Sequence, residues 1–290
     1  MTDLPRLKPD PIPSPHPVPE LLAEGELKAR YEDMKAVLRV PWMGVVTMSF
    51  AYYRPFYDAL WAGTRALCGT REFTEACRHL RRAVEAKVGL LAPPPARERL
   101  SQIGYAAREI EAIDEVIEIF SYGNFPYLLL ATLARLLLEG GELRASDTTG
   151  TPAKRPSTSI AGRLVLMEYH HADAATRAVF DDVRAALGLP FLNTDYRALA
   201  RWPSYFSLAW RDLRPKLSTG DYAALVNEIH AAAVAGVRDL PNFASLCGET
   251  LRAAARSSAA EGEVLAIVRL FQWLLPGLVT NVAFFRAQLR

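Results

Sequence analysis

The chain has 290 residues, 50% of them hydrophobic and 23% charged, a composition typical of a globular protein with one large domain or two smaller ones. The 34 Lys and Arg residues against 32 Asp and Glu residues give a net charge of +2, which provides no electrostatic case for binding nucleic acid or an anionic membrane. The apolar runs at 127–138 and 271–285 are interrupted, residues 1–10 lack an apolar signal region, and three cysteines form no disulfide framework. We therefore expect a cytoplasmic protein with no nucleic-acid or membrane partner.

The first element in chain order is a tail at residues 1–20, which contains seven of the 20 prolines. Closely spaced prolines remove backbone donors and favour extended polyproline geometry, so the pattern predicts a tail that lies along the surface or is disordered. A ligand for an SH3-type domain is the less favoured alternative. A second polar stretch, at 140–159, has the composition of a linker and lies near the midpoint of the chain.

An internal repeat organises the rest of the sequence. A shift of 149 residues places Arg30–Phe73 on the second half without a gap. The identical pairs include Asp33 and Asp182, Trp61 and Trp210, and Arg65 and Arg214. After one added residue, Pro126 aligns with Pro276. The sequence thus predicts a tail at 1–20, a helical repeat at 20–139, a linker at 140–159 and a second helical repeat at 160–290.

Each copy has helical periodicity. Asp173 is the expected N-cap of a helix over Ala174–Leu187, which Gly188 ends, and the first copy has a matching helix at 26–38. Apolar residues also recur three and four positions apart over 73–91, 107–124, 127–141, 222–237 and 261–275. No segment alternates with period two over more than a few residues. The expected fold is all-α, an internal duplication of two pseudo-symmetric helical repeats packed as a pseudo-dimer.

The two copies differ at two polar residues in apolar surroundings. Asp195 lies opposite Val46, and Asn124 lies opposite Leu274. Burying an unpaired carboxylate or amide among apolar side chains costs folding free energy, so these two residues are candidates for a function. Because they belong to opposite copies, a site that uses both is expected between the copies. The structural alternative is that Asn193–Asp195 is a helix N-cap and that Asn124 is a turn or helix-end residue.

At these residues the chain resembles a known family. The stretch LNTDYRALARWPSYFSLAWRDLRP at 192–215, VPW at 40–42 and YGNFP at 122–126 are similar to the group I 2-haloacid dehalogenases, which act on D- and L-2-haloalkanoic acids. The resemblance covers about 30–290 and includes a duplicated all-α architecture. It implies a hydrolase acting on carbon–halide bonds, with a small-molecule 2-haloacid as its substrate.

The resemblance also implies residue roles. Asp195 activates water for direct displacement of halide, and Asn124 helps to hold that water. Thr194 helps to hold the substrate, and Trp42 matches an aromatic position of the pocket wall. Val45 occupies a position where another aromatic residue is expected. With no arginine assigned to the substrate carboxylate, backbone amides near Thr194–Tyr196 are the expected partners.

These residue types suit attack by water rather than by the carboxylate itself. A carboxylate can accept the proton of a water that attacks the carbon from behind, and an amide can orient that water. A covalent ester would need a second base to hydrolyse it, and the sequence offers no obvious one. We expect inversion of configuration, no cofactor and no metal. The sequence leaves a homodimer open.

Two other interpretations carry less weight. Glu168, His170, His171 and Asp173 contain metal-ligating residue types, but they lie directly before a capped helix, so a solvated face is favoured. The second function hypothesis is a non-dehalogenating helical homologue that binds a small carboxylate or serves as an interaction protein. Retention of both Asp195 and Asn124 favours the enzyme.

Overall fold

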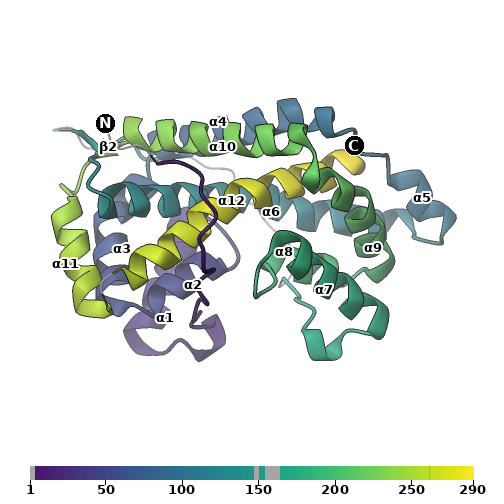
Figure 1. Cartoon of the computed structure of the whole chain (residues 1–290), viewed down its shortest axis with the longest axis horizontal. Helices are drawn as coiled ribbons and strands as arrows, with labels where there is room; N and C mark the ends of the chain where they lie inside the picture. The colour runs from purple at the N-terminus through teal and green to yellow at the C-terminus, as the bar shows by residue number, and fades with distance from the viewer. Residues whose placement is uncertain (1–3, 147–149, 154–163, 261) are drawn as a thin grey trace. The chain divides into compact units, whose positions relative to one another are not determined.

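The computed structural model describes residues 4–146, 150–153, 164–260 and 262–290. Part of the predicted linker, at 147–149 and 154–159, lies outside the described residues. Within the described ranges the chain forms twelve α-helices and one parallel pair of two-residue strands, β1 (Arg144–Ala145) and β2 (Pro241–Asn242) (Figure 1). The predicted all-α class is confirmed.

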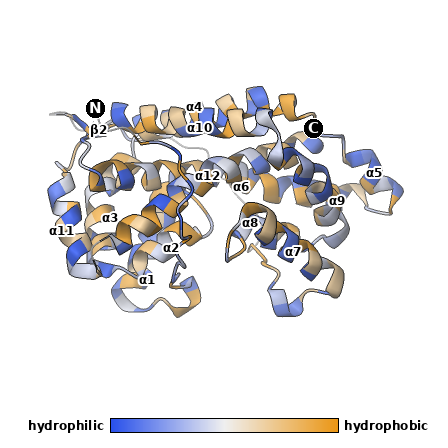
Figure 2. Cartoon of the chain, viewed as in Figure 1, coloured by the Kyte–Doolittle hydropathy of each residue, from blue (hydrophilic) through white to orange (hydrophobic). Residues whose placement is uncertain are grey.

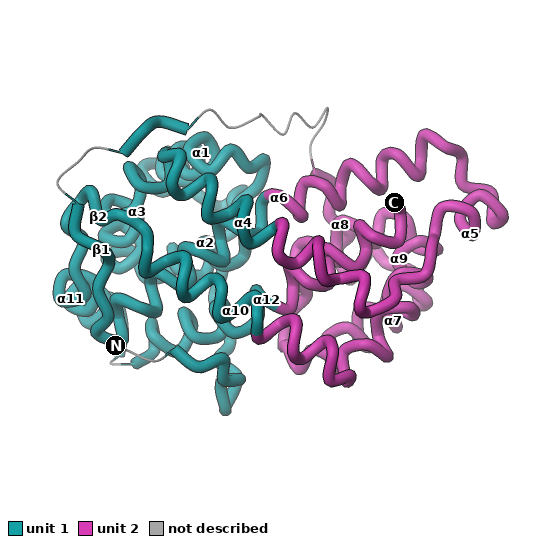
Figure 3. The backbone as a smooth tube through the Cα atoms, turned by 90° about the horizontal axis from the view of Figure 1, so that it is seen from above, with its two compact units in different colours: residues 1–81, 123–158, 228–276 teal, residues 82–122, 159–227, 277–290 magenta. Residues whose placement is uncertain are grey.

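The chain divides into two compact units that are interleaved along the sequence (Figure 3). Unit 1 comprises residues 1–81, 123–158 and 228–276, and unit 2 comprises residues 82–122, 159–227 and 277–290. Four of the five boundaries fall within helices, namely α4 (Arg71–Lys87), α6 (Ala107–Leu138), α10 (Gly220–Asp239) and α12 (Glu263–Gln288). Each unit therefore takes segments from both halves of the chain, whereas the repeats predicted at 20–139 and 160–290 are continuous.

Unit 1 is arranged around α3 (Arg54–Cys68), which packs against α1 (Gly25–Leu38), α2 (Val45–Ala51) and α11 (Gly248–Ser258). Apolar residues follow helical spacing on α3 and α11, and Figure 2 shows apolar and polar residues interspersed along these two helices. Aromatic rings fill the interior. The fully buried Phe50 meets Phe56 and Phe271 edge to face, with ring centroids 5.6 and 6.0 Å away.

Unit 2 contains α5 (Arg97–Gln102), α7 (Ala174–Leu187), α8 (Thr194–Leu199) and α9 (Pro203–Leu213), with α9 in contact with both α7 and α8. Helix α7 has the predicted bounds. Asp173 Oδ1 accepts the N–H of Thr176 at 2.7 Å, and Gly188 ends the helix in the left-handed region with φ of 62°. Local sequence signals are sufficient to define this helix.

Helices α6 and α12 continue through Pro126 and Pro276. The sequence predicted separate helical stretches at 107–124 and 127–141, so the continuity of α6 corrects that prediction. An internal proline costs roughly 3 kcal/mol because it removes a backbone hydrogen bond and crowds the preceding turn. Burial of the apolar residues on both sides outweighs that cost. Both helices are long and apolar enough to cross a membrane, but 83% and 72% of their most apolar windows are buried.

The start of the described chain is held against unit 1. Leu4 is 3% exposed, and its carbonyl oxygen lies 2.7 Å from Nε2 of His230. The carbonyl of Pro5 accepts an N–H of Arg135 at 2.9 Å, and Arg6 donates to the carbonyl of Trp273 at 3.1 Å. We call residues 4–8 the N-terminal strap.

Corresponding contacts occur in the two halves of the chain. Helices α1, α2, α3 and α4 begin at Gly25, Val45, Arg54 and Arg71, and α7, α8, α9 and α10 each begin 149 residues later, at Ala174, Thr194, Pro203 and Gly220. Trp61 donates its indole N–H to Asp33 at 2.8 Å, and Trp210 does the same to Asp182 at 2.7 Å. The arginine four residues after each tryptophan binds the same aspartate.

Candidate active site

Asp195 lies in the first turn of α8, in unit 2, and is 3% exposed. Asn193 occupies the N-cap position of α8, but its side chain makes no capping hydrogen bond. The alternative interpretation of Asn193–Asp195 as a helix N-cap is therefore not supported by a side-chain capping bond from Asn193. The counterpart Val46 is also the second residue of its helix and is 4% exposed. The carboxylate thus occupies a position that an apolar side chain fills in α2.

The next residue, Tyr196, anchors this turn in the core of unit 2. Its ring packs against Trp210 and Phe285, with centroids 6.0 and 6.4 Å away. Its hydroxyl accepts an N–H from the side-chain amide of Asn281 at 2.9 Å, and Oδ1 of Asn281 accepts the hydroxyl of Tyr222 at 2.8 Å. Burial raises the pKa of Tyr196 well above its ordinary value, so its hydroxyl stays neutral.

Asn124 lies within α6, in unit 1, and is 4% exposed. The residue before it, Gly123, faces the ring of Trp42 so closely that a Cβ there would lie 2.3 Å from Cη2. The Trp42 carbonyl accepts the hydroxyl of Tyr127 at 2.7 Å, and the two rings meet edge to face at 5.9 Å. Tyr127 also lies directly against Gly44, where a Cβ would be 2.9 Å from the ring. The structure therefore brings the VPW turn and the YGNFP segment together.

The six predicted site residues fall into two groups. Trp42, Val45 and Asn124 belong to unit 1, where Trp42 is buried and Val45 half-buried. Thr194, Asp195 and Tyr196 are consecutive in unit 2, and all three are buried. The Tyr196 side chain is occupied by core contacts.

The segment containing Glu168, His170, His171 and Asp173 shows no metal-binding arrangement. The two histidines are exposed neighbours whose ring centroids are 4.0 Å apart, and Asp173 caps α7. Over the described ranges, no group of three or more His, Cys, Asp or Glu residues could hold a metal ion. These observations fit the solvated face that the sequence favours.

Sequence reasoning missed Asn281 and Tyr222. Asn281 is 1% exposed and lies opposite Ala131 in the alignment that places Asn124 opposite Leu274. It is therefore another polar residue at a position that is apolar in the other half. Applied to the last helix, the comparison that singled out Asn124 would have identified it.

Comparisons with curated proteins identify close relatives over nearly the whole chain. The chain is 50% identical over 250 residues to an (R)-2-haloacid dehalogenase from Rhizobium sp. (strain NHG3), which covers 86% of this chain and 97% of the relative. It is 38% identical over 276 residues to an (R)-2-haloacid dehalogenase from Pseudomonas putida, covering 94% and 92% of the two chains. A configuration-inverting 2-haloacid dehalogenase from Alcaligenes xylosoxydans xylosoxydans is 30% identical over 251 residues, covering 78% of each chain. No family model matches the chain.

Solved structures similar to this chain are also 2-haloacid dehalogenases. The crystal structure of a D-2-haloacid dehalogenase mutant superposes with a TM-score of 0.87 at 36% identity, covering 95% of this chain and 96% of the other. Complexes of D-2-haloacid dehalogenase with L-lactate and, for a mutant, with D-2-chloropropionate match with TM-scores of 0.87 and 0.86, at the same identity and coverage. The chain belongs to the family of configuration-inverting (R)-2-haloacid dehalogenases, hydrolases that act on carbon–halide bonds.

Proposed function

We propose that this enzyme hydrolyses (R)-2-haloalkanoic acids to (S)-2-hydroxyalkanoic acids by direct attack of water, without a covalent ester. The observation that carries the stereochemical part of the proposal is the pair of ligands in the similar structures, D-2-chloropropionate and L-lactate. Attack by water instead of by the carboxylate rests on the sequence, which offers no obvious second base to hydrolyse an ester. A D substrate and an L product are related by one inversion at the reacting carbon. The relatives at 50% and 38% identity are both (R)-2-haloacid dehalogenases, which favours the D enantiomer over the broader D and L range.

Asp195 is the proposed general base. Water attacks the carbon opposite the halogen, so the carbon–oxygen bond forms as the carbon–halogen bond breaks and halide leaves with the electron pair. The water proton passes to the Asp195 carboxylate. A buried carboxylate on a helix turn fixed by Tyr196 has few ways to move, and a fixed base suits this step.

Asn124 is proposed to orient the attacking water, since an amide offers both a donor and an acceptor. Trp42 and Val45 form the proposed pocket wall, with Val45 leaving more room than an aromatic residue would. Thr194 and the backbone amide of Tyr196 are proposed to contact the substrate. The close approach of Trp42 to Gly123, the residue before Asn124, supports placing Trp42 and Asn124 in the same part of the site.

We also propose that the fold arose by internal duplication and forms a pseudo-dimer of two repeats. The matched helix starts and the repeated Trp–Asp–Arg contacts support this proposal. In this interpretation Asp195 and Asn124 are departures from a shared framework.

The path of oxygen tests the mechanism. In a single turnover in ¹⁸O-labelled water, with enzyme in excess over (R)-2-chloropropionate, the hydroxyl oxygen of the (S)-lactate product should carry the label. Unlabelled lactate, with label later found in Asp195, would show that the carboxylate attacks carbon and forms an ester. A racemic or (R) product would contradict inversion.

Substitution of the base tests the residue assignment. Asp195→Asn keeps the shape of the side chain and should lower the rate of halide release by about 100-fold or more, with an unchanged circular dichroism spectrum. Asp221→Asn is the matched control, because Asp221 is an exposed acid in the first turn of α10. An Asp195→Asn variant with near wild-type activity would exclude Asp195 as the base.

A further inference from the structure

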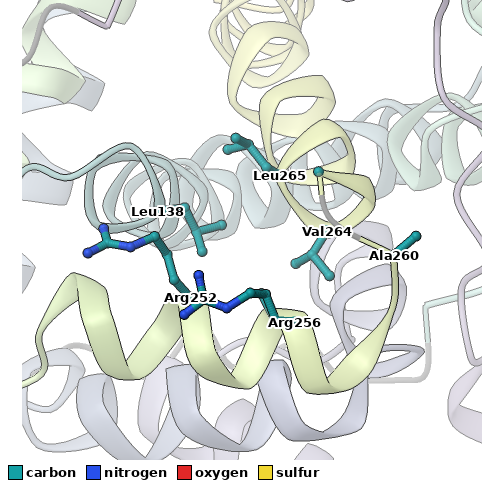
Figure 4. Close-up of a pocket in the computed structure, with 8 residues that line it drawn as sticks. Leu138, Arg252, Arg256, Ala260, Val264 and Leu265 are labelled. Carbon is teal, nitrogen blue, oxygen red and sulfur yellow. The ribbon is translucent and has the colours of Figure 1, made fainter.

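Unit 1 contains a pocket of about 230 Å³ that includes none of the predicted active-site residues. It is formed by the end of α6, by α11, by the start of α12 and by Ala260 and Gly262 between the last two helices (Figure 4). The residues used below are Leu138 on α6, Arg252 and Arg256 on α11, and Val264 and Leu265 on α12.

Two arginines of one helix line this pocket, and Arg256 is exposed. Arg252 and Arg256 are four residues apart on α11, so both side chains project from the same face, as Figure 4 shows. Arg252 Nη1 donates to the carbonyl of Leu137 at 3.0 Å, which fixes that side chain and leaves its other N–H groups for further partners. Within the described part of the chain, neither arginine forms an ion pair with a carboxylate. Two like charges at this spacing repel each other, and a bound anion would relieve the repulsion.

The remaining walls are apolar. Leu138 and Val264 are 7% and 2% exposed, and Leu265 lies beside them in the first turn of α12. The volume lies below the roughly 300–1,000 Å³ of pockets for drug-sized ligands, so it suits a small molecule. A complementary ligand has one anionic end and a short hydrocarbon chain.

We propose that this pocket binds a small monocarboxylate with a short aliphatic chain. The carboxylate lies between the guanidinium groups of Arg252 and Arg256, which present paired N–H donors in the geometry that a carboxylate accepts. The chain lies against Leu138, Val264 and Leu265. This assignment does not depend on the role of Asp195, so either can fail without the other.

Methyl-resolved NMR of the full-length protein with sodium hexanoate tests the proposal at the site itself. The methyl signals of Leu138, Val264 and Leu265 should shift and saturate as hexanoate is added. Hexanol, which lacks the charge, and inorganic phosphate, which lacks the chain, should produce no saturable shift of these signals. A saturable shift with phosphate would show a general anion site and overturn the proposal, and so would an absence of shift with hexanoate.

Variants then test whether the arginines themselves bind the hexanoate carboxylate. Arg256→Gln should weaken hexanoate binding at these methyl groups about tenfold, since a charge-assisted hydrogen-bond pair is lost. Arg256→Lys, which keeps the charge without the paired donors, should give an intermediate effect. Arg108→Gln is the control, because Arg108 is an exposed arginine on α6 outside the pocket. Equal binding by wild type and Arg256→Gln would overturn the proposal, and unchanged methyl signals in the ligand-free variant would establish that the fold is intact.

Discussion

Asn281 donates its amide N–H to the hydroxyl of Tyr196 at 2.9 Å, and this bond joins the last helix of the chain to the residue beside the proposed base. Tyr222 extends the network by donating its hydroxyl to Oδ1 of Asn281 at 2.8 Å. The corresponding residues of the other half, Ala131 and Phe73, cannot form these bonds. The polar network therefore accompanies Asp195 and is absent where Val46 takes its place.

Asn281→Leu should lower both stability and kcat. The substitution removes the hydrogen-bond partner of the buried Tyr196 hydroxyl, at a cost of about 1–3 kcal/mol in the free energy of unfolding. Asp195 should then be held less firmly, so kcat should fall at least about tenfold with a smaller change in KM. Urea unfolding and steady-state halide release measure the two effects. Tyr222→Phe is the control, since it keeps the bond between Asn281 and Tyr196. A stability loss with unchanged kcat in Asn281→Leu would contradict a positioning role for Asn281.

Gly123→Ala should disturb the predicted pocket wall. The new Cβ would lie 2.3 Å from Cη2 of Trp42 and 2.8 Å from Cζ3, so the ring or the helix must move. We expect a loss of stability of about 1–3 kcal/mol and a rise in KM, measured by thermal unfolding and halide release. Gly236 is the matched control, because it is also helical and a Cβ there meets nothing within 4 Å. Gly236→Ala should stabilise the protein by about 0.5–1 kcal/mol.

Asp33→Asn should alter the response of the protein to acid. The hydrogen bond from Arg65, opposed by partial burial and assisted by Trp61, holds the pKa of the Asp33 carboxyl below its usual value. With a folded-state pKa below that of the unfolded chain, the ionised group stabilises the fold above about pH 4, and this contribution is lost as the pH falls through the folded-state pKa.

Urea unfolding of wild type and Asp33→Asn between pH 6 and pH 3 measures this effect. The free energy of unfolding of wild type should fall more steeply below about pH 4 than that of the variant. Parallel curves would show that Asp33 has the same pKa in both states.

Leu4→Ala should destabilise the protein by about 2 kcal/mol, because Leu4 is 3% exposed in the N-terminal strap. Leu7→Ala is the control in the same segment, since Leu7 is 66% exposed and should have little effect. Thermal unfolding of the two variants makes the comparison. Equal melting temperatures would mean that the strap contributes nothing to the stability of unit 1.

Local signals in the sequence predicted much of the helical structure. Asp173 and Gly188 define α7 because a cap and a left-handed terminator act within a few residues of the helix that they bound. Pro126 indicated a helix end that does not exist. The free-energy cost of a proline inside α6 is outweighed by burial of this helix, which depends on residues far away in the sequence. The same holds for the N-terminal strap, whose partners Arg135, His230 and Trp273 no local pattern connects to residues 4–8.

In the candidate site too, some residues could be predicted from the sequence, while others depend on contacts between distant segments. Comparing the halves singled out Asp195 and Asn124, because a buried polar residue opposite an apolar one is visible in an alignment. The Asn281–Tyr196 bond spans 85 residues and depends on how α12 packs on α8, which the sequence does not state. Likewise, the contact of Gly123 with Trp42 requires the packing of α6 against the VPW turn.

The interleaving of the units has a consequence for biosynthesis. Unit 1 needs residues up to 276 and unit 2 needs residues up to 290, so neither unit has all its segments until at least residue 276 has been synthesised. A nascent chain emerges at about 5–20 residues per second, and the apolar faces of α2 and α3 must therefore wait many seconds on the ribosome for α11 and α12. The early segments are thus the part of this protein most exposed to aggregation during synthesis, and chaperone dependence in a heterologous host should be traced to them.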